Sequence, residues 1–273
     1  MVDTSAPSRS RSPTCSICGD AGWLRLDVPI TDPRFGTIVP CACQKAQHER
    51  ERSERLFALS RLGERQRLMT FQTFYTHDIP YEHVVGRTPH ALAEIYRSLK
   101  QAKDAAQAYA EEPNGWLVLI GDTGCGKTHL AVAVCNERIR RGEPVLFQVV
   151  PDLLDHLRAT YAPTSTVTYD DLFEEVRTAP LLVLDDLGAQ SSSQWAQEKL
   201  FQIVNFRYNH KLPTIVTTNM PPERLEQRLA SRMLDRGSII VGIRAPDFRG
   251  ETARGAEQGH ASSSHGRNGR SRS

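Results

Sequence analysis

The amino-acid sequence predicts an α/β fold, in which five parallel strands form a sheet covered by helices on both faces, over residues 71–249. The first observation behind this prediction is that short apolar runs, such as residues 116–120 and 181–184, alternate with longer segments of helical pattern. Uninterrupted apolar strands are typical of a parallel sheet that is buried on both faces. The second observation is a glycine-rich turn that joins the first strand directly to a helix.

The elements of this domain follow one another in a regular order. Strands are expected at residues 116–120, 145–150, 181–184, 214–218 and 238–243, and helices at 127–141, 152–161, 169–177, 195–211 and 223–234. Gly142 stands where a helix cap belongs, because glycine readily adopts the left-handed conformation that ends many helices. We find no internal repeat.

A phosphate-binding loop is indicated by residues 121–128, which match G-x-x-x-x-G-K-[ST] at every fixed position between a strand and a helix. Glycines let backbone N–H groups surround a β-phosphate, and the start of the helix adds the positive end of its dipole. We expect Lys127 to reach the β- and γ-phosphates and the Thr128 hydroxyl to bind Mg²⁺. The residues expected to contact ATP are Gly121, Asp122, Thr123, Gly124, Cys125, Gly126, Lys127, Thr128 and His129.

Two acidic residues follow the apolar strand at 181–184. Asp185 is expected to hold Mg²⁺ together with Thr128, and Asp186 to orient or deprotonate the attacking water. Asn219 follows the next strand and could hold the same water. Alternatively, Asn219 serves only the turn before two prolines. The sequence therefore predicts a catalytic site for ATP hydrolysis at the ends of these strands.

Four cysteines near the N-terminus indicate a zinc site. Cys15 and Cys18 form a Cys-x2-Cys pair, and Cys41 and Cys43 form a Cys-x-Cys pair after 22 intervening residues. Four thiolates suit tetrahedral zinc, whose binding energy of roughly 10–16 kcal/mol would stabilise a module with little apolar material. We therefore expect a zinc module over residues 14–43, with four free structural cysteines as the alternative.

The remaining segments are polar or strongly charged. Residues 1–13 and 250–273 have almost no large apolar side chains, so we expect both to be disordered. Residues 44–70 combine many charges with Leu56, Leu59 and Leu62 at helical spacing, which predicts an amphipathic helix or helix pair. This helical segment is a candidate linker and partner-binding surface.

Charge and hydropathy exclude some classes of protein. The chain has 34 basic and 32 acidic residues, so any basic surface for nucleic acid must be local. A helix needs about 20 apolar residues to span a bilayer, and the apolar runs of this chain are far shorter, so no membrane association is expected. No secretory signal precedes the cysteines, which favours a reducing, cytoplasmic location.

The motifs together resemble the DnaC/DnaI helicase loaders, which are AAA+ ATPases related to the IstB transposition helper. The resemblance is carried by GCGKTHLA at 124–131, LLVLDDLG at 181–188, LPTIVTTN at 212–219 and SRMLDRG at 231–237. It implies that Asn219 is the sensor 1 residue. It also implies that Arg232 acts as an arginine finger on the nucleotide of a neighbouring subunit, with Arg228 as the second candidate, and that Arg249 is the sensor 2 arginine.

The expected function is that of an ATP-dependent helicase loader with ATP, Mg²⁺ and Zn²⁺ as cofactors. The resemblance implies single-stranded DNA, a ring-hexamer replicative helicase and further copies of the chain as partners. Asp186 stands where AAA+ proteins usually have glutamate, and this shorter side chain favours slow hydrolysis. The alternatives are an IstB-like helper of a DNA transposase and a nucleotide-gated scaffold without useful hydrolysis.

Overall fold

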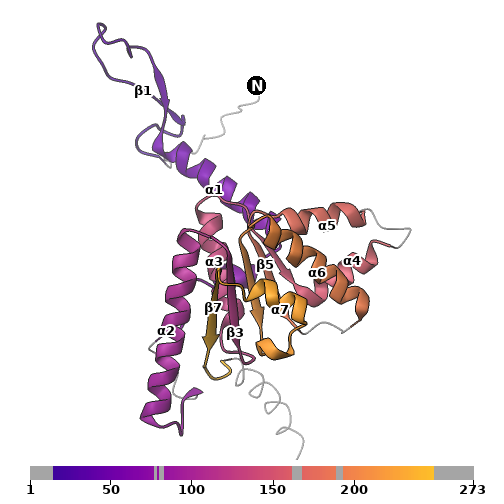
Figure 1. The fold of residues 1–273 in the computed structure, drawn as a ribbon. Coiled ribbons are helices and arrows are strands. Elements are labelled where there is room, and N and C mark those ends of the chain that lie inside the picture. Colours follow the sequence, from indigo (N-terminus) through magenta and orange to yellow (C-terminus); the bar gives the residue numbers. More distant parts are fainter. Residues whose placement is uncertain (1–14, 77–78, 80–82, 162–167, 189–192, 249–273) are drawn as a thin grey trace, which may run out of the picture. The chain divides into compact units, whose positions relative to one another are not determined.

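The computed structural model describes residues 15–76, 79, 83–161, 168–188 and 193–248 (Figure 1). The chain divides into two compact units, Met1–Arg55 and Leu56–Ser273. The segments expected to be disordered, 1–13 and 250–273, and the predicted sensor Arg249 lie outside the described residues. Among the helices that are described, none is long and apolar enough to cross a bilayer.

The larger unit is built on a five-stranded sheet in which all neighbouring strands run parallel. The spatial order is β4-β5-β6-β3-β7. The strand bounds are β3 (Trp116–Gly121), β4 (Leu146–Val149), β5 (Leu182–Leu187), β6 (Thr214–Thr218) and β7 (Ser238–Ile243). All five strands were expected from the sequence at these places, and the parallel sheet is confirmed.

Helices cover both faces of this sheet because successive strand residues point to opposite sides. Leu117 and Leu119 of β3 pack in the core that contains α2 (Pro89–Glu111) and α3 (Lys127–Arg140). Trp116 and Val118 pack in the opposite core. That second core contains α4 (Val150–Ala159), α5 (Tyr169–Thr178), α6 (Gln194–Asn209) and α7 (Gln227–Met233).

Three details differ from the sequence-based expectations. Val150 begins α4 instead of ending a strand, and Pro151 occupies the first turn of that helix, where proline is tolerated. The helix expected over 223–234 is divided into a 3-10 turn, Pro222–Arg224, and the shorter α7. Helix α2 was not among the predicted elements, although Thr88 caps it by accepting a hydrogen bond from the Ala91 N–H.

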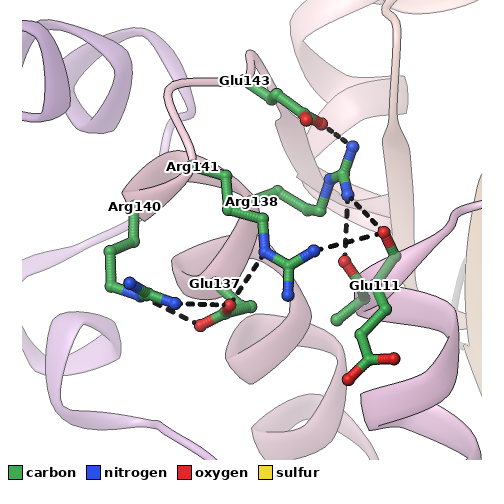
Figure 2. Close-up of polar contacts among 7 residues, drawn as sticks. Glu111, Glu137, Arg138, Arg140, Arg141 and Glu143 are labelled. Atoms are coloured by element: carbon green, nitrogen blue, oxygen red, sulfur yellow. Dashed lines mark hydrogen bonds and ion pairs between the residues drawn. The ribbon is translucent and has the colours of Figure 1, made fainter.

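The C-terminal ends of α2 and α3 are joined by arginines (Figure 2). Arg138 donates to the carbonyls of Ala110 and Glu111 at 3.0 and 3.1 Å, and Arg141 donates to the Glu111 carbonyl at 3.2 Å. These carbonyls lie in the last turn of α2, where the helix has no partners of its own to offer. Arg138 also forms an ion pair with Glu143. Basic side chains of α3 thus cap α2 and fix the two helices to each other.

The N-terminal unit contains a short antiparallel hairpin of β1 (Trp23–Arg25) and β2 (Ile38–Pro40). Helix α1 (Ala42–Leu59) follows at once, so Cys43 lies in its first turn. A 3-10 helix, Glu64–Leu68, comes after α1. The helical segment expected over 44–70 is therefore present as one long helix and one short 3-10 helix.

Candidate nucleotide site and cysteine cluster

The candidate nucleotide site lies at the carboxyl ends of the three central strands. In the order β5-β6-β3, these ends carry Asp185, Thr217 and the loop that starts at Gly121. Ligands of open parallel sheets bind at this edge, because the loops that leave the strands meet there. The topology therefore brings together residues that are far apart in the sequence.

The loop has the conformation that a phosphate-binding site needs. Gly124 and Gly126 have φ values of +77° and +100°, which side-chain-bearing residues rarely adopt. Gly126 is also the N-cap of α3, so no side chain at this position covers the first N–H groups of the helix. The Lys127 ammonium lies within the loop and donates to the carbonyls of Gly121 and Asp122 at 2.9 and 2.8 Å. Helix start and ammonium together form a site for an anion.

Thr128 and Asp185 face each other, as the sequence predicts for residues that share Mg²⁺. The Thr128 hydroxyl donates to the Asp185 carboxylate at 3.0 Å. Burial raises the pKa of Asp185, while hydrogen bonds from Thr217 and Thr128 act in the opposite direction. A buried carboxylate beside a hydroxyl is a donor set that suits Mg²⁺, which prefers oxygen ligands. These residues therefore fit the Mg²⁺ ion that accompanies a bound nucleoside triphosphate.

Thr217 is a site residue for which the sequence analysis assigned no role. Its hydroxyl donates to Asp185 Oδ1 at 2.6 Å and accepts from the Asp186 N–H at 2.9 Å. Asp186 has a φ of +59°, at an irregularity in the pairing of β5 with β6. A non-glycine residue in this conformation is held there by its surroundings and is typical of functional sites. Thr217 supplies one of these restraints.

The other predicted residues lie near the same edge or on α7. Asn219 follows β6 and is exposed, so its role as a sensor stays a prediction. Arg232 donates to Asn205 Oδ1 at 3.3 Å, and its guanidinium carbon lies 5.3 Å from the Tyr208 ring centroid. Arg228 pairs with Glu226 and lies 4.3 Å from the Phe201 ring centroid. Both arginines therefore contact α6, and a finger role for either one stays a prediction.

The four cysteines of the N-terminal unit form one cluster. Their Sγ atoms all lie within 4.8 Å of one another, with Cys15 and Cys41 at 3.8 Å and Cys18 and Cys43 at 3.4 Å. Tetrahedral zinc with Zn–S bonds of about 2.3 Å requires sulfur atoms about 3.8 Å apart. Hydrogen bonds from the N–H groups of Cys18 and Ile17 lower the pKa of Cys15 to about 7, whereas hydrogen bonds with Cys18 and Cys41 raise the pKa of Cys43. Zinc binds the thiolate form, so a bound ion would deprotonate both. The cluster is therefore compatible with zinc in both geometry and chemistry.

Among curated proteins, this chain is similar to helicase loaders. The replicative helicase loader DnaC of Escherichia coli (strain K12) is 34% identical over 138 residues, which cover 50% of this chain and 56% of that protein. The replicative helicase loader DnaI of Bacillus subtilis (strain 168) is 29% identical over 125 residues, 45% of this chain and 39% of that protein. The chain thus spans only about half the length of its DnaC relatives, or less of DnaI.

Solved structures show the fold, and a family model shows the family. The crystal structure of the DnaC helicase loader has a TM-score of 0.53 at 23% identity and covers 67% of this chain and 100% of that one. The crystal structure of DnaI has a TM-score of 0.52 at 21% identity and covers 71% and 98%. These likenesses confirm the predicted AAA+ P-loop fold. The family model described as IstB-like ATP binding protein matches residues 94–247, which is more than half of the chain. The chain therefore belongs to the family of IstB-like ATP-binding proteins.

Proposed function

We propose that this protein is an ATP-dependent helicase loader that binds and slowly hydrolyses ATP. The single observation that carries the proposal is the meeting of the phosphate loop with Asp185, 3.0 Å from the Thr128 hydroxyl. Lys127 would neutralise the phosphates, and Thr128 and Asp185 would hold Mg²⁺, which supplies charge compensation on the transferring phosphoryl group. Asp186 would orient the attacking water.

The choice of a loader among ATPases is supported by relatives. The proteins that match at 34% and 29% identity are named replicative helicase loaders. We propose that the zinc module and helical segment, residues 14–43 and 44–70, bind a ring-shaped replicative helicase, and that residues 71–249 form the ATPase. The cytoplasmic location expected from the sequence suits such a partner.

Binding of single-stranded DNA is supported by a row of aromatic side chains with a lysine beside it, which is formed by Tyr161 after α4 and by residues of α5 and α6. Tyr161, Tyr169 and Phe173 stack in succession, with ring centroids 5.5 and 5.3 Å apart. The Lys199 ammonium lies 5.1 Å from the Tyr169 ring centroid, and Tyr161 at the end of the row is 59% exposed. Aromatic platforms next to cations are typical of proteins that bind single strands.

The second candidate function is that of an ATPase helper for a DNA transposase. It is favoured by the family model, which is named after IstB and matches residues 94–247. Pull-down with a replicative helicase and with a transposase distinguishes the two functions. Capture of the helicase would support the proposed function as a helicase loader, and capture of the transposase alone would contradict that function.

Phosphate release distinguishes an ATPase from a nucleotide-gated scaffold. We expect slow release of phosphate from ATP, and a faster release when single-stranded DNA is added. The variant Lys127→Ala should release no phosphate. The matched control is Lys199→Ala, which removes a lysine far along the chain from the phosphate loop and should lower only the response to DNA. Turnover that persists in Lys127→Ala would refute the ATPase assignment.

A further inference from the structure

Strand β7 forms one edge of the five-stranded sheet and has no charged residue. Among the described strands, it pairs with β3 alone. The six residues of Ser238–Ile243 contain no charged side chain and no proline. Ile239 and Ile240 point to opposite faces of the sheet and are 40% and 48% exposed. Edge strands are often protected from further pairing by charge or proline, and β7 lacks this protection.

The two edges of the sheet differ in how their outer backbone groups are used. On β4, the Phe147 N–H donates to the Ser60 carbonyl at 2.9 Å, so the segment after α1 lies against that edge. On β7, Ser98 of α2 covers only the last part. Its hydroxyl donates to the Gly242 carbonyl at 3.3 Å and accepts from the Arg244 N–H at 2.7 Å. The described residues leave the part of β7 before Gly242 open to another strand.

The bonds of Ser98 show which groups of β7 face outward. In a strand, the N–H and C=O of one residue point to the same side, and every second residue repeats that direction. Because the Gly242 carbonyl faces Ser98, the N–H and C=O of Ile240 and Ser238 also face away from β3. The Ser238 N–H donates to the Asp235 carbonyl at 2.9 Å. Four outward groups then have no bonding partner in the described part of the chain, namely the Ser238 C=O, the Ile240 N–H and C=O, and the Gly242 N–H.

We propose that a second copy of this chain pairs with β7 in antiparallel direction, about a two-fold axis at Ile240. In this register the Ile240 N–H of each copy donates to the Ile240 C=O of the other, and the Gly242 N–H donates to the Ser238 C=O. All four open groups of each strand are thereby bonded, each partially positive N–H to a partially negative C=O. The two groups that this pairing leaves out, the Ser238 N–H and the Gly242 C=O, already have partners in Asp235 and Ser98. The edge is therefore complementary to itself, as a two-fold interface requires.

The side chains of β7 suit the same pairing. Ile240 lies beside Val118 on the face of α6 and α7, and in the pair it would face its own copy. Ile239 lies beside Leu117 on the face of α2, and it would face Val241 of the second copy. Apolar side chains are then buried on both faces, and no like charges meet along the strands. The nucleotide site takes no part in this contact, so the inference does not rest on the proposed binding of ATP.

Analytical ultracentrifugation of the full chain without nucleotide tests the pairing. We expect a monomer–dimer equilibrium that shifts to the dimer as the concentration rises to about 100 µM. Ile240→Lys brings two like charges together at the two-fold axis and should raise the dissociation constant about tenfold or more. The Ile240 side chain is half exposed, so the circular dichroism of this variant should match that of the wild type. The control Leu68→Lys changes a side chain that is 73% exposed on another element, and it should dimerise like the wild type.

A cross-link tests the position of the two-fold axis. Opposite residues of a hydrogen-bonded antiparallel pair have Cα atoms about 5.5 Å apart, a separation that a disulfide spans. Ile240→Cys should therefore form a disulfide-linked dimer on oxidation, much faster than the wild type or Leu68→Cys, since the protein's own cysteines are clustered or buried. Arg232→Ala should dimerise like the wild type, which separates this contact from one made by an arginine finger. A wild type that stays monomeric at about 100 µM, or an Ile240→Lys variant that dimerises as strongly as the wild type, would overturn the proposal.

Discussion

At the scale of single residues, Thr217 connects the side chain of one acidic residue of the candidate ATPase site, Asp185, to the backbone of the other, Asp186. It is buried, and its one hydroxyl both donates to Asp185 and accepts from the backbone of Asp186. Thr217→Val keeps the shape of the side chain but removes both hydrogen bonds. We expect about 10- to 100-fold slower ATP hydrolysis, as is typical when a partner of a metal-binding carboxylate is lost. Steady-state phosphate release at saturating Mg²⁺ measures the change.

The neighbouring threonine provides the matched control for this variant. Thr218 is equally buried, but its hydroxyl donates to the Leu187 carbonyl and contacts neither acidic side chain. Thr218→Val should lower stability about as much as Thr217→Val and leave the hydrolysis rate much closer to that of the wild type. Equal rates in the two variants would contradict a positioning role for Thr217.

The pKa of Asp185 predicts how stability depends on pH. Burial raises this pKa above that of an ordinary aspartate, so the folded protein retains the proton to higher pH than the unfolded chain does. Without Mg²⁺, the contribution of Asp185 to stability is therefore most favourable at low pH and declines as the pH rises through the raised pKa. Asp185→Asn cannot ionise and should lack this decline. Urea unfolding of both proteins at a series of pH values isolates the difference, and parallel curves would contradict the prediction.

At the scale of elements, the sequence predicts those parts whose signal is local. Residues 116–119 and 181–184 are apolar because they are buried on both faces of the sheet, and the loop at 121–128 needs its own glycines. Helix α2 has a weaker signal, because Ala102, Ala106 and Ala110 form much of its buried face and alanine marks no clear apolar stripe. A capping Thr88 followed by Pro89 is the signal that could have located it.

The candidate site, too, has residues that the sequence predicts and contacts that only the tertiary fold creates. Lys127, Thr128 and Asp185 are predictable because they belong to motifs of fixed spacing. The contact of Thr217 with Asp185 depends on the order β5-β6, and the contact of His129 with Thr70 joins segments 59 residues apart. Such contacts are set by the tertiary fold, and no spacing within one segment encodes them.

The arginines that cap α2 make a prediction at this scale (Figure 2). The Arg138 side chain is only 13% exposed and donates to two carbonyls at the end of α2. Arg138→Met keeps the apolar stem but leaves those carbonyls without the arginine. We expect a loss of about 1–3 kcal/mol in the free energy of unfolding, measured with urea. In the control Arg140→Met, the side chain that is changed is 72% exposed and loses only its ion pair with Glu137, so the loss should be under about 0.5 kcal/mol.

At the scale of the whole molecule, we expect the loss of zinc from the N-terminal unit to leave the larger unit folded and able to bind ATP. The four thiols lie within residues 15–43, whereas both apolar cores of the larger unit are formed by residues from Phe57 onward. We expect one zinc per chain by elemental analysis and none in Cys41→Ser. Affinity for ATP should change little in this variant. Cys135→Ala, which alters a buried cysteine outside the cluster, should keep its zinc, and a wild type without zinc would contradict the four-thiolate site.

An arginine finger would make ATP hydrolysis depend on contact between two copies of the chain. If Arg232 acts on the nucleotide of a neighbour, the variant Arg232→Ala has an intact phosphate loop but needs an arginine from another chain. Lys127→Ala has the reverse defect. Each variant alone should be nearly inactive, because an arginine finger contributes about 10³- to 10⁵-fold to the rate. Mixing the two should restore hydrolysis, since some interfaces then combine an intact loop with an intact Arg232.

Arg228→Ala mixed with Lys127→Ala in the same way tests the second candidate for the finger. Recovery in this mixture alone would assign the finger to Arg228. A rate per chain that is independent of concentration, with no recovery in either mixture, would show that each chain hydrolyses ATP alone.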